Sequence, residues 1–392
     1  MTKRVALAYL ALTLAGPAGH AQAQQSVSDV LTFLVTNQSV ATGNFERDRA
    51  AAQAASDTIS RALLANIATL PITASSGAFV YRLNPELGTV ERATETFGPF
   101  FVERALTAGT RHASFGLNVQ HMTFTSLDGH SLRNGSLVTT ANQFVDERAP
   151  FDVDQLTLKI DASVATLYGN FGVTNRLDVG FAVPMVALRL NGTRVNTYRG
   201  RAFTQATASA VAMGVADVAV RSKYMLYAKG GSGLAADVDL RLPTGKREDL
   251  LGAGSTSARF SGIGSIESGR FSAHANGGVS IGGLARELTY AGAVAFAASN
   301  HVTLTSELLG RRIDSPGGIV PVSAANPNLI GVETIRLLPD ATRLHVITLV
   351  PGLKWNLSDT WVLAGSVSIP LTTAGLTSPF TPFVGLDYAF GR

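Results

Sequence analysis

Apolar and polar residues alternate along most of the chain after Arg111. From Leu156 to Tyr168 nearly every second residue is apolar, and the residues between them include Lys159 and Asp161. The same alternation recurs in 234–242 and 271–281. A period of two predicts strands with one apolar and one polar face, and we expect the apolar faces to point outward. The predicted strands lie near 112–124, 153–169, 176–190, 215–228, 233–243, 257–267, 270–282, 287–299, 301–312, 343–357, 360–370 and 380–390.

The connections between these strands alternate in length. The short ones are rich in Gly, Asn, Asp and Ser, as tight turns are; they are 170–175, 229–232, 268–269, 300 and 358–359. The longer ones are 125–152, 191–214, 244–256, 313–342 and 371–379. Short turns on one side and long loops on the other are typical of transmembrane barrels, whose short turns face the periplasm. An even number of strands then places both ends of the barrel in the periplasm.

The region before the strands has a different period. From Ser28 to about Leu70 apolar residues recur every three or four positions, which predicts helices that end at Pro71. Residues 72–111 are irregular and have room for one short hairpin. This N-terminal segment, 24–110, has two possible uses. It is a plug inside the barrel, with charged residues facing the lumen, or a periplasmic cap with a solvated helix face.

The first residues predict export. Lys3 and Arg4 precede an apolar run from Val5 to Ala15, and 21–23 reads Ala-Gln-Ala. This pattern is typical of a secretory signal peptide, here residues 1–23. Cleavage would remove two positive charges from the formal net charge of +4, and the remaining charges are scattered. The pattern therefore argues against nucleic-acid binding.

Composition narrows the fold class. The chain has no cysteine, which excludes thiolate zinc sites and thiol catalysis. Its mean hydropathy is +0.20, yet no stretch after the signal approaches the roughly 18–20 apolar residues of a spanning helix. An exported apolar chain of this kind predicts an all-β fold, a transmembrane antiparallel β-barrel of about twelve strands over 111–392, in the bacterial outer membrane. A β-solenoid or adhesin would show a fixed repeat, which is absent.

Strand parity places a set of charged residues on the polar face. They either set selectivity along the lumen or form structural ion pairs that fill it, and the two roles are compatible. The predicted lumen-lining residues are Lys159, Asp161, Arg221, Lys223, Asp237, Asp239, Arg241, Glu307 and Arg311.

Aromatic residues gather near the short turns and the chain end. Rings with one apolar and one wet side favour the membrane interface. The predicted interfacial aromatics are Tyr168, Tyr227, Trp355, Trp361, Tyr388 and Phe390.

The sequence offers little evidence for a catalytic site. His274 and Asn276 resemble two members of a hydrolytic triad, but no serine follows His274 closely and no G-x-S-x-G motif occurs. Neither phosphate-loop nor dinucleotide motifs are complete. We therefore expect no enzyme activity, no cofactor and no metal.

Three segments, in order, resemble an outer-membrane barrel family named for the MetA pathway of phenol degradation. They are 168–184, which reads YGNFGVTNRLDVGFAVP; 214–224, which begins GVADV and ends KY; and 240–254, which contains LRLPTG and LGAG. The matching motif residues are Tyr168, Gly172, Asp178, Pro184, Asp217, Pro243, Thr244 and Gly245. The chain departs from the family in its long N-terminal segment. It also ends in Gly391 and Arg392 after Phe390, where barrels usually present a terminal aromatic residue to the barrel-assembly machinery.

The resemblance implies a channel or transporter for small, hydrophobic or aromatic molecules. Its expected partners are the lipid bilayer, the assembly machinery and a small-molecule substrate. Two other hypotheses remain. One is a structural or interaction barrel whose N-terminal helices bind another envelope component, and the other is a membrane-embedded enzyme, which the missing triad argues against.

Overall fold

The computed structural model describes residues 25–35, 56–57, 59–65, 74, 81–84, 89–92, 94–314, 318–326, 328–340, 342–358 and 360–391. The predicted signal peptide and most of the predicted helical stretch between 36 and 70 lie outside these residues. No helix among the residues described is long and apolar enough to cross a membrane.

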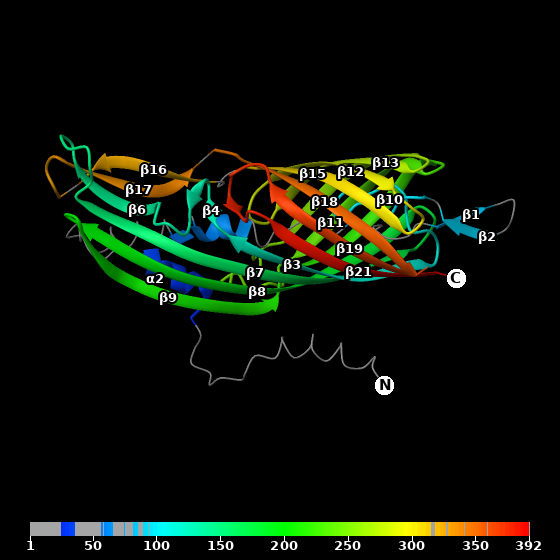
Figure 1. Cartoon of the computed structure of the whole chain (residues 1–392), viewed down its shortest axis with the longest axis horizontal. Helices are drawn as coiled ribbons and strands as arrows, with labels where there is room; N and C mark the ends of the chain where they lie inside the picture. The colour runs from blue at the N-terminus through cyan, green and yellow to red at the C-terminus, as the bar shows by residue number, and fades with distance from the viewer. Residues whose placement is uncertain are drawn as a thin grey trace, which may run out of the picture.

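Twelve antiparallel strands close into a barrel (Figure 1). Each of the twelve predicted strands corresponds to one of them, and the predicted barrel is confirmed. In order around the wall they are β7 (Asp152–Gly172), β3 (His112–Phe124), β21 (Thr381–Gly391), β19 (Trp361–Pro370), β18 (Leu344–Ser358), β15 (Val302–Ile313), β14 (Glu287–Ala297), β13 (Phe271–Gly282), β12 (Ser257–Ser268), β11 (Ser232–Leu242), β10 (Val218–Lys229) and β8 (Leu177–Tyr198). Pairing of β8 with β7 completes the circle.

Two barrel strands continue well beyond the barrel. β7 has 21 residues and β8 has 22, about twice the 9–11 that a membrane-spanning strand needs. Their outer halves form an open sheet in the order β16-β17-β6-β7-β8-β9. The added strands are β6 (Leu137–Phe144), β9 (Arg201–Val215), β16 (Gly318–Ala325) and β17 (Val332–Asp340). Figure 1 shows this extension at the end opposite the C-terminus.

The extension corrects the sequence prediction, which treated 125–152, 191–214 and 313–342 as loops. The long β7 and β8 leave free backbone edges beyond the barrel. β6 pairs with β7 and β9 pairs with β8 along these edges, so both segments form strands. The other small elements are β1 (Tyr81–Asn84), β2 (Thr89–Arg92), β4 (Ser126–Leu127), β5 (His130–Ser131) and β20 (Leu376–Thr377). β1 and β2 form the short hairpin for which 72–111 had room.

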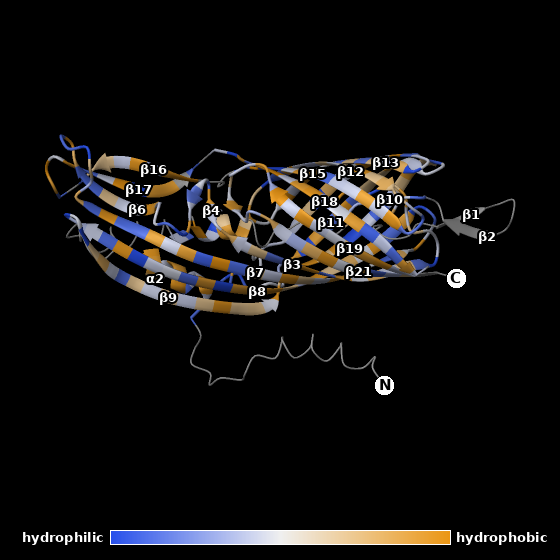
Figure 2. Ribbon diagram, in the orientation of Figure 1, coloured by the Kyte–Doolittle hydropathy of each residue, from blue (hydrophilic) through white to orange (hydrophobic). Residues whose placement is uncertain are grey.

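The outward face of the barrel is an apolar belt. On β8 the exposed side chains are Val179, Phe181 and Met185, and beyond them the outward positions turn polar with Arg189 and Asn191. The apolar part of β8 thus spans about eleven residues, the length of a bilayer-crossing strand. Figure 2 shows hydrophobic and hydrophilic residues alternating along the strands. A belt of this height is what a bilayer requires.

The interior of the extension is apolar, and the predicted facing of β7 is reversed along the whole run from Leu156 to Tyr168. Leu156, Leu158 and Ile160 are fully buried and point inward, while Lys159 is exposed on the outside and Asp161 is half-buried there. The prediction that Lys159 and Asp161 line the lumen is therefore wrong. At this level the outward positions of β7 are polar, and its inward side chains share a core with residues of 27–35 and 59–64.

Helix α2 (Val27–Val35) packs against the inner face of β8 and β9. Ser26 caps it, since its Oγ accepts a hydrogen bond from the backbone N of Asp29 at 3.0 Å. The helix begins at Val27, one residue before the start that the periodicity predicts. Val30, Leu31 and Leu34 share one helix face and are buried in the same apolar core as the helical residues Ile59 and Leu63.

Candidate functional site

An irregular segment, residues 94–108, runs through the periplasmic half of the barrel interior. We call it the strap. Its backbone has no regular partner strand, so side chains of the barrel wall satisfy it. Glu307 accepts hydrogen bonds from the backbone nitrogens of three successive strap residues, Phe100, Phe101 and Val102, the last two at 2.9 Å. One buried carboxylate thus fixes three successive residues of the strap against β15.

Further wall residues anchor the strap on both sides of Glu307. Lys354 is fully buried, donates a hydrogen bond to the carbonyl oxygen of Pro99 at 3.1 Å, and lies over the Phe100 ring at 4.9 Å. Ser265 Oγ accepts from the backbone N of Ala105 at 2.8 Å. The strap is therefore bound to both β18 and β12, which are separated around the wall by three strands.

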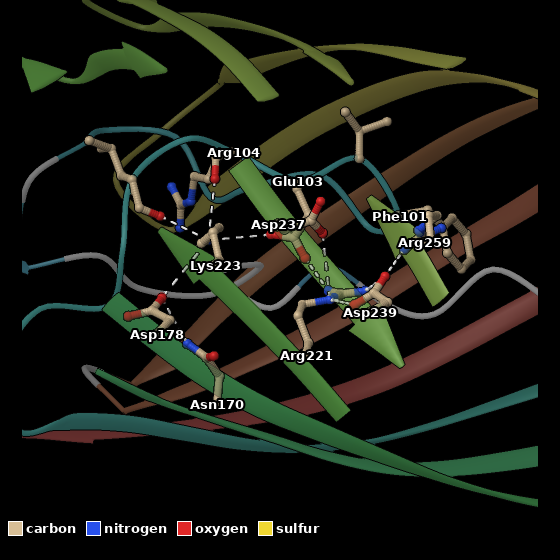
Figure 3. A network of polar contacts seen from close by, with 12 residues as sticks. Phe101, Glu103, Arg104, Asn170, Asp178, Arg221, Lys223, Asp237, Asp239 and Arg259 are labelled. Carbon is tan, nitrogen blue, oxygen red and sulfur yellow. Dashed lines mark hydrogen bonds and ion pairs between the residues drawn. The ribbon is translucent and has the colours of Figure 1, made fainter. Parts of the chain in front are cut away.

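The strap contributes Glu103 to a buried charge network (Figure 3). Glu103 binds Arg221 and Lys223 of β10, the latter at 3.3 Å. Lys223 also donates to the strap carbonyl oxygens of Arg104 at 3.2 Å and Leu106 at 3.0 Å. Since Lys223 is fully buried, its charge requires these acceptors. The network therefore ties the strap to the barrel wall through charge as well as backbone.

The network continues along the wall away from the strap. Asp239 of β11 binds Arg221 of β10 and Arg259 of β12, and Asp237 lies 4.0 Å from Arg221. Further around the wall, Glu287 of β14 and Arg311 of β15 form a bidentate ion pair with hydrogen bonds of 2.7 and 2.8 Å. Arg221, Asp239 and Arg259 thus lie directly opposite one another on neighbouring strands, which stabilises their charges in the low-dielectric interior.

A cavity of about 350 Å³ lies beside this network. The strap residues Phe101 and Glu103 form one boundary, and the helical residues Arg61 and Ala65 form another. Its wall comes from β11 to β15. Loop residues such as Arg247 and Leu284, from the rim opposite the short turns, also line it. The cavity therefore reaches from the outer rim down to the strap.

Seven of the nine predicted lumen residues do face the interior. Four of them line the cavity, and the other three bind the strap residues Glu103 or Phe101, which also line it. The seven are Arg221, Lys223, Asp237, Asp239, Arg241, Glu307 and Arg311. The structure places these seven side chains in the interior, and their role in selectivity stays a prediction.

The predicted interfacial aromatics divide into two groups. Tyr227, Trp355 and Trp361 are 40–57% exposed on the outer face, and the Trp361 ring lies 4.8 Å from that of Tyr388. Tyr168 is buried, and its hydroxyl donates to Asp387 inside the barrel. The prediction that Tyr168 lies at the membrane interface is therefore wrong. Its parity points inward, where a buried carboxylate needs a donor. The Phe390 side chain lies outside the described residues.

The motif residues gather at two places. Asp178 accepts hydrogen bonds from the strap nitrogen of Ala108 and from Asn170, and lies 3.9 Å from Lys223. Gly172 is where the chain leaving the strap touches β7, since an added Cβ there would collide with the carbonyl oxygen of Gly109. This first group fixes the exit of the strap.

The second group fixes a bulge between β9 and β10. Asp217 accepts from the backbone nitrogens of Gly245 at 3.0 Å and Ala253 at 2.8 Å. Thr244 donates to Ala216 O at 2.7 Å, and the backbone N of Ala216 donates to the carbonyl oxygen of Pro184. β11 ends at Leu242, immediately before Pro243, as the proline predicts.

The sequence did not predict the residues that bind the charged side chains of the barrel wall. Glu103 and the strap as a whole showed no period, so nothing in the pattern connected them with Arg221. Lys354, Asp387 and Arg259 do lie on the polar parity of their strands, and parity could have identified them.

His274 contacts two serines that sequence spacing did not reveal. Its ring nitrogens lie 2.8 Å from Ser265 Oγ and 3.1 Å from Ser272 Oγ. Ser265 also binds the strap, and Ser272 binds Thr96. This buried trio holds the strap in place, and among the described residues both ring nitrogens of His274 face serine hydroxyls rather than the carboxylate of a hydrolytic triad. Within the described parts of the chain, no three His, Asp or Glu residues form a metal-ligand group.

No protein-family model matches the sequence, and no curated protein sequence matches it. Among solved structures, the chain is similar to the COG4313 outer membrane channel from Pseudomonas putida F1, with 13% identity, 73% of this chain and 98% of that chain covered, and a TM-score of 0.47. It is also similar to the P. putida toluene transporter TodX, with 11% identity, 72% and 90% covered, and a TM-score of 0.34.

The fold itself defines the class. A closed antiparallel barrel of twelve strands, with an apolar outer belt and a polar, charged interior, is a transmembrane β-barrel of the bacterial outer membrane. The chain is a barrel of this class whose interior contains its own N-terminal strap.

Proposed function

We propose that this barrel passes small molecules across the outer membrane and that its N-terminal segment is a plug. The observation that supports this is the cavity, which runs from the outer rim to the strap. A solute entering from outside reaches a chamber of ligand size, and the strap lies between that chamber and the periplasmic end. Movement of the strap would then control passage.

The strap has the features of a closed gate. It is fixed by hydrogen bonds and ion pairs to named side chains, from Glu307 and Lys354 on one side to Lys223 and Ser265 on the other. Hydrogen bonds between the strap and the wall can be replaced by hydrogen bonds to water. Packed apolar side chains gain no such replacement, so separating them has a large cost in free energy. The strap is thus better suited to release than the apolar core around α2.

Membership of the phenol-degradation family named for MetA is part of this proposal. Its support is that the motif residues coincide with the strap exit at Asp178 and Gly172 and with the bulge at Asp217. The signal peptide 1–23 and the division at residue 110 also remain proposals.

The alternative, an interaction barrel whose helices bind another envelope component, predicts accessible helix faces. In α2 the apolar face is buried in the extension, and Phe33 is the large apolar side chain of this helix that stands exposed. This burial favours the plug.

The cysteine-free chain permits a direct test. Ala105→Cys and Ser265→Cys would join the strap to β12, where the Ala105 nitrogen and Ser265 Oγ are 2.8 Å apart. In proteoliposome swelling with small neutral sugars, we expect the oxidised pair to block solute entry and the reduced pair to restore it. Each single cysteine variant is the control.

Equal rates of solute entry in the oxidised and reduced states would contradict gating by the strap. No entry in either state, from protein that shows the heat-dependent gel shift of a folded barrel, would favour the structural barrel.

A further inference from the structure

The outer wall of the barrel carries basic residues just beyond the outer end of its apolar belt. The exposed apolar residues of the belt end at Val119 on β3 and Met185 on β8, which lie opposite the same β7 residue, Ala165. Further along the same outward face, Lys159 of β7 and Arg189 of β8 are both exposed. Cations in this position meet the headgroup layer of a membrane rather than its hydrocarbon core.

The two cations are close neighbours on adjacent strands. In the β7–β8 ladder Lys159 lies opposite Asn191 and Arg189 lies opposite Asp161, so the cations are diagonal to each other. Residues related in this way are about 7–8 Å apart, within reach of long side chains. Neither cation forms an ion pair in the part of the chain that the structure describes, and Asp161 accepts a hydrogen bond from Thr123 at 2.7 Å. Both cations are therefore available to one anion.

Neutral polar groups surround the two cations on the same face. Asn191 is exposed, and the exposed Ser209 of β9 lies opposite it. His121 of β3 is exposed one row closer to the belt. Asp161 is the acidic residue of this face, and its charge offsets one of the two cations, so the cluster stays positive. Two cations with amide and hydroxyl donors beside them suit a phosphate group, which offers several strong acceptor oxygens.

We propose that Lys159, Arg189 and Asn191 bind a phosphate of the glycolipid in the outer leaflet of the outer membrane, an acylated and phosphorylated glucosamine lipid. Its acyl chains would lie along the belt, where Met185 and Val211 are 46% and 47% exposed, while its phosphate meets the cations. Val211 lies directly opposite Arg189, so apolar and basic groups adjoin in one row. The sugar hydroxyls give the exposed amide of Asn191 further partners. This site on the outer wall is independent of passage through the lumen.

The test is native mass spectrometry of the refolded barrel in detergent, titrated with lipid A, with dephosphorylated lipid A or with phosphatidylethanolamine. We expect lipid A to bind at least about tenfold more tightly than either of the others. The double variant Lys159→Gln with Arg189→Gln should weaken lipid A binding about tenfold or more. The matched control is Arg176→Gln with Lys229→Gln, which removes two exposed cations beside the short turns at the opposite end and should leave the affinity unchanged.

Arg189→Lys, which keeps the charge, should retain most of the binding, and the heat-dependent gel shift verifies the fold of each variant. Equal losses in the two double variants, or no loss in the first, would overturn the proposal. Equal affinity for dephosphorylated lipid A would exclude phosphate recognition, and equal affinity for phosphatidylethanolamine would exclude the glycolipid. Displacement of lipid A by an equal concentration of inorganic phosphate would mean that the cluster binds free anions instead.

Discussion

Lys354 of β18 donates a hydrogen bond to the carbonyl oxygen of Pro99, 3.1 Å away, and so joins the barrel wall to the strap. The lysine is fully buried, and its ammonium also lies over the Phe100 ring. Because the strap has no strand partner, contacts of this kind decide whether it stays inside the barrel.

Replacing Lys354 with Met should loosen the strap. The change keeps the side-chain length but removes the donor, which leaves the Pro99 carbonyl without this partner at a cost of about 1–3 kcal/mol. In planar bilayers we expect more frequent or longer open events than in the wild type. Leu353→Met, on the lipid face of the same strand, is the matched control. Unchanged conductance in K354M would show that this contact does not hold the gate.

Replacing Glu103 with Gln should destabilise the barrel strongly. Arg221 and Lys223 would keep their charges but lose a buried carboxylate, and breaking such a pair costs about 3–5 kcal/mol. We expect a lower urea midpoint for unfolding in detergent micelles. The double variant Glu103→Gln with Lys223→Met removes one of the stranded charges, so its loss should be smaller than the sum of the single losses. Strict additivity would mean that the two side chains do not interact.

Gly172→Ala should disturb the exit of the strap. A methyl group there would collide with the backbone of Gly109, which cannot rotate away as a side chain could. We expect a loss of about 1–3 kcal/mol in unfolding free energy. Gly262→Ala is the control, because nothing lies within 4 Å of its added Cβ. If both variants unfold at the same urea concentration, the close approach of Gly109 is not a constraint.

The barrel could be predicted because a lipid-facing wall imposes a period of two that each strand carries in its own residues. Phe271 to Ile281 shows this clearly, with its apolar set exposed and its polar set facing the interior. The outer half of β7 shows the same period, yet the period does not say which face is inside. Leu158 points inward because α2 and its neighbours fill the extension, and that information lies far away in the chain.

The site could be predicted only on the wall side. Arg221, Asp237 and Asp239 follow strand parity, so the alternation was enough to place them inside. Glu103 belongs to the strap, which is held by side chains of β10 and β15 rather than by its own pattern. A segment without a period gives no local sign of where it will lie, and the partner of Arg221 was therefore missed.

Helix α2 offers a final test of the plug. Leu34 is fully buried, and a Cβ added at Gly192 of β8 would collide with its Cδ1. Leu34→Ala should cost about 2–5 kcal/mol and increase hydrogen exchange across 27–35, because the helix loses an anchor in the core. Gly192→Ala alone should also destabilise the protein, but in the double variant the new methyl group occupies the space that Leu34 leaves, so the two losses should partly cancel. Phe33→Ala is the control on the same helix, since Phe33 is 51% exposed. Equal exchange in the Leu34 and Phe33 variants would mean that α2 is not anchored in the extension as described.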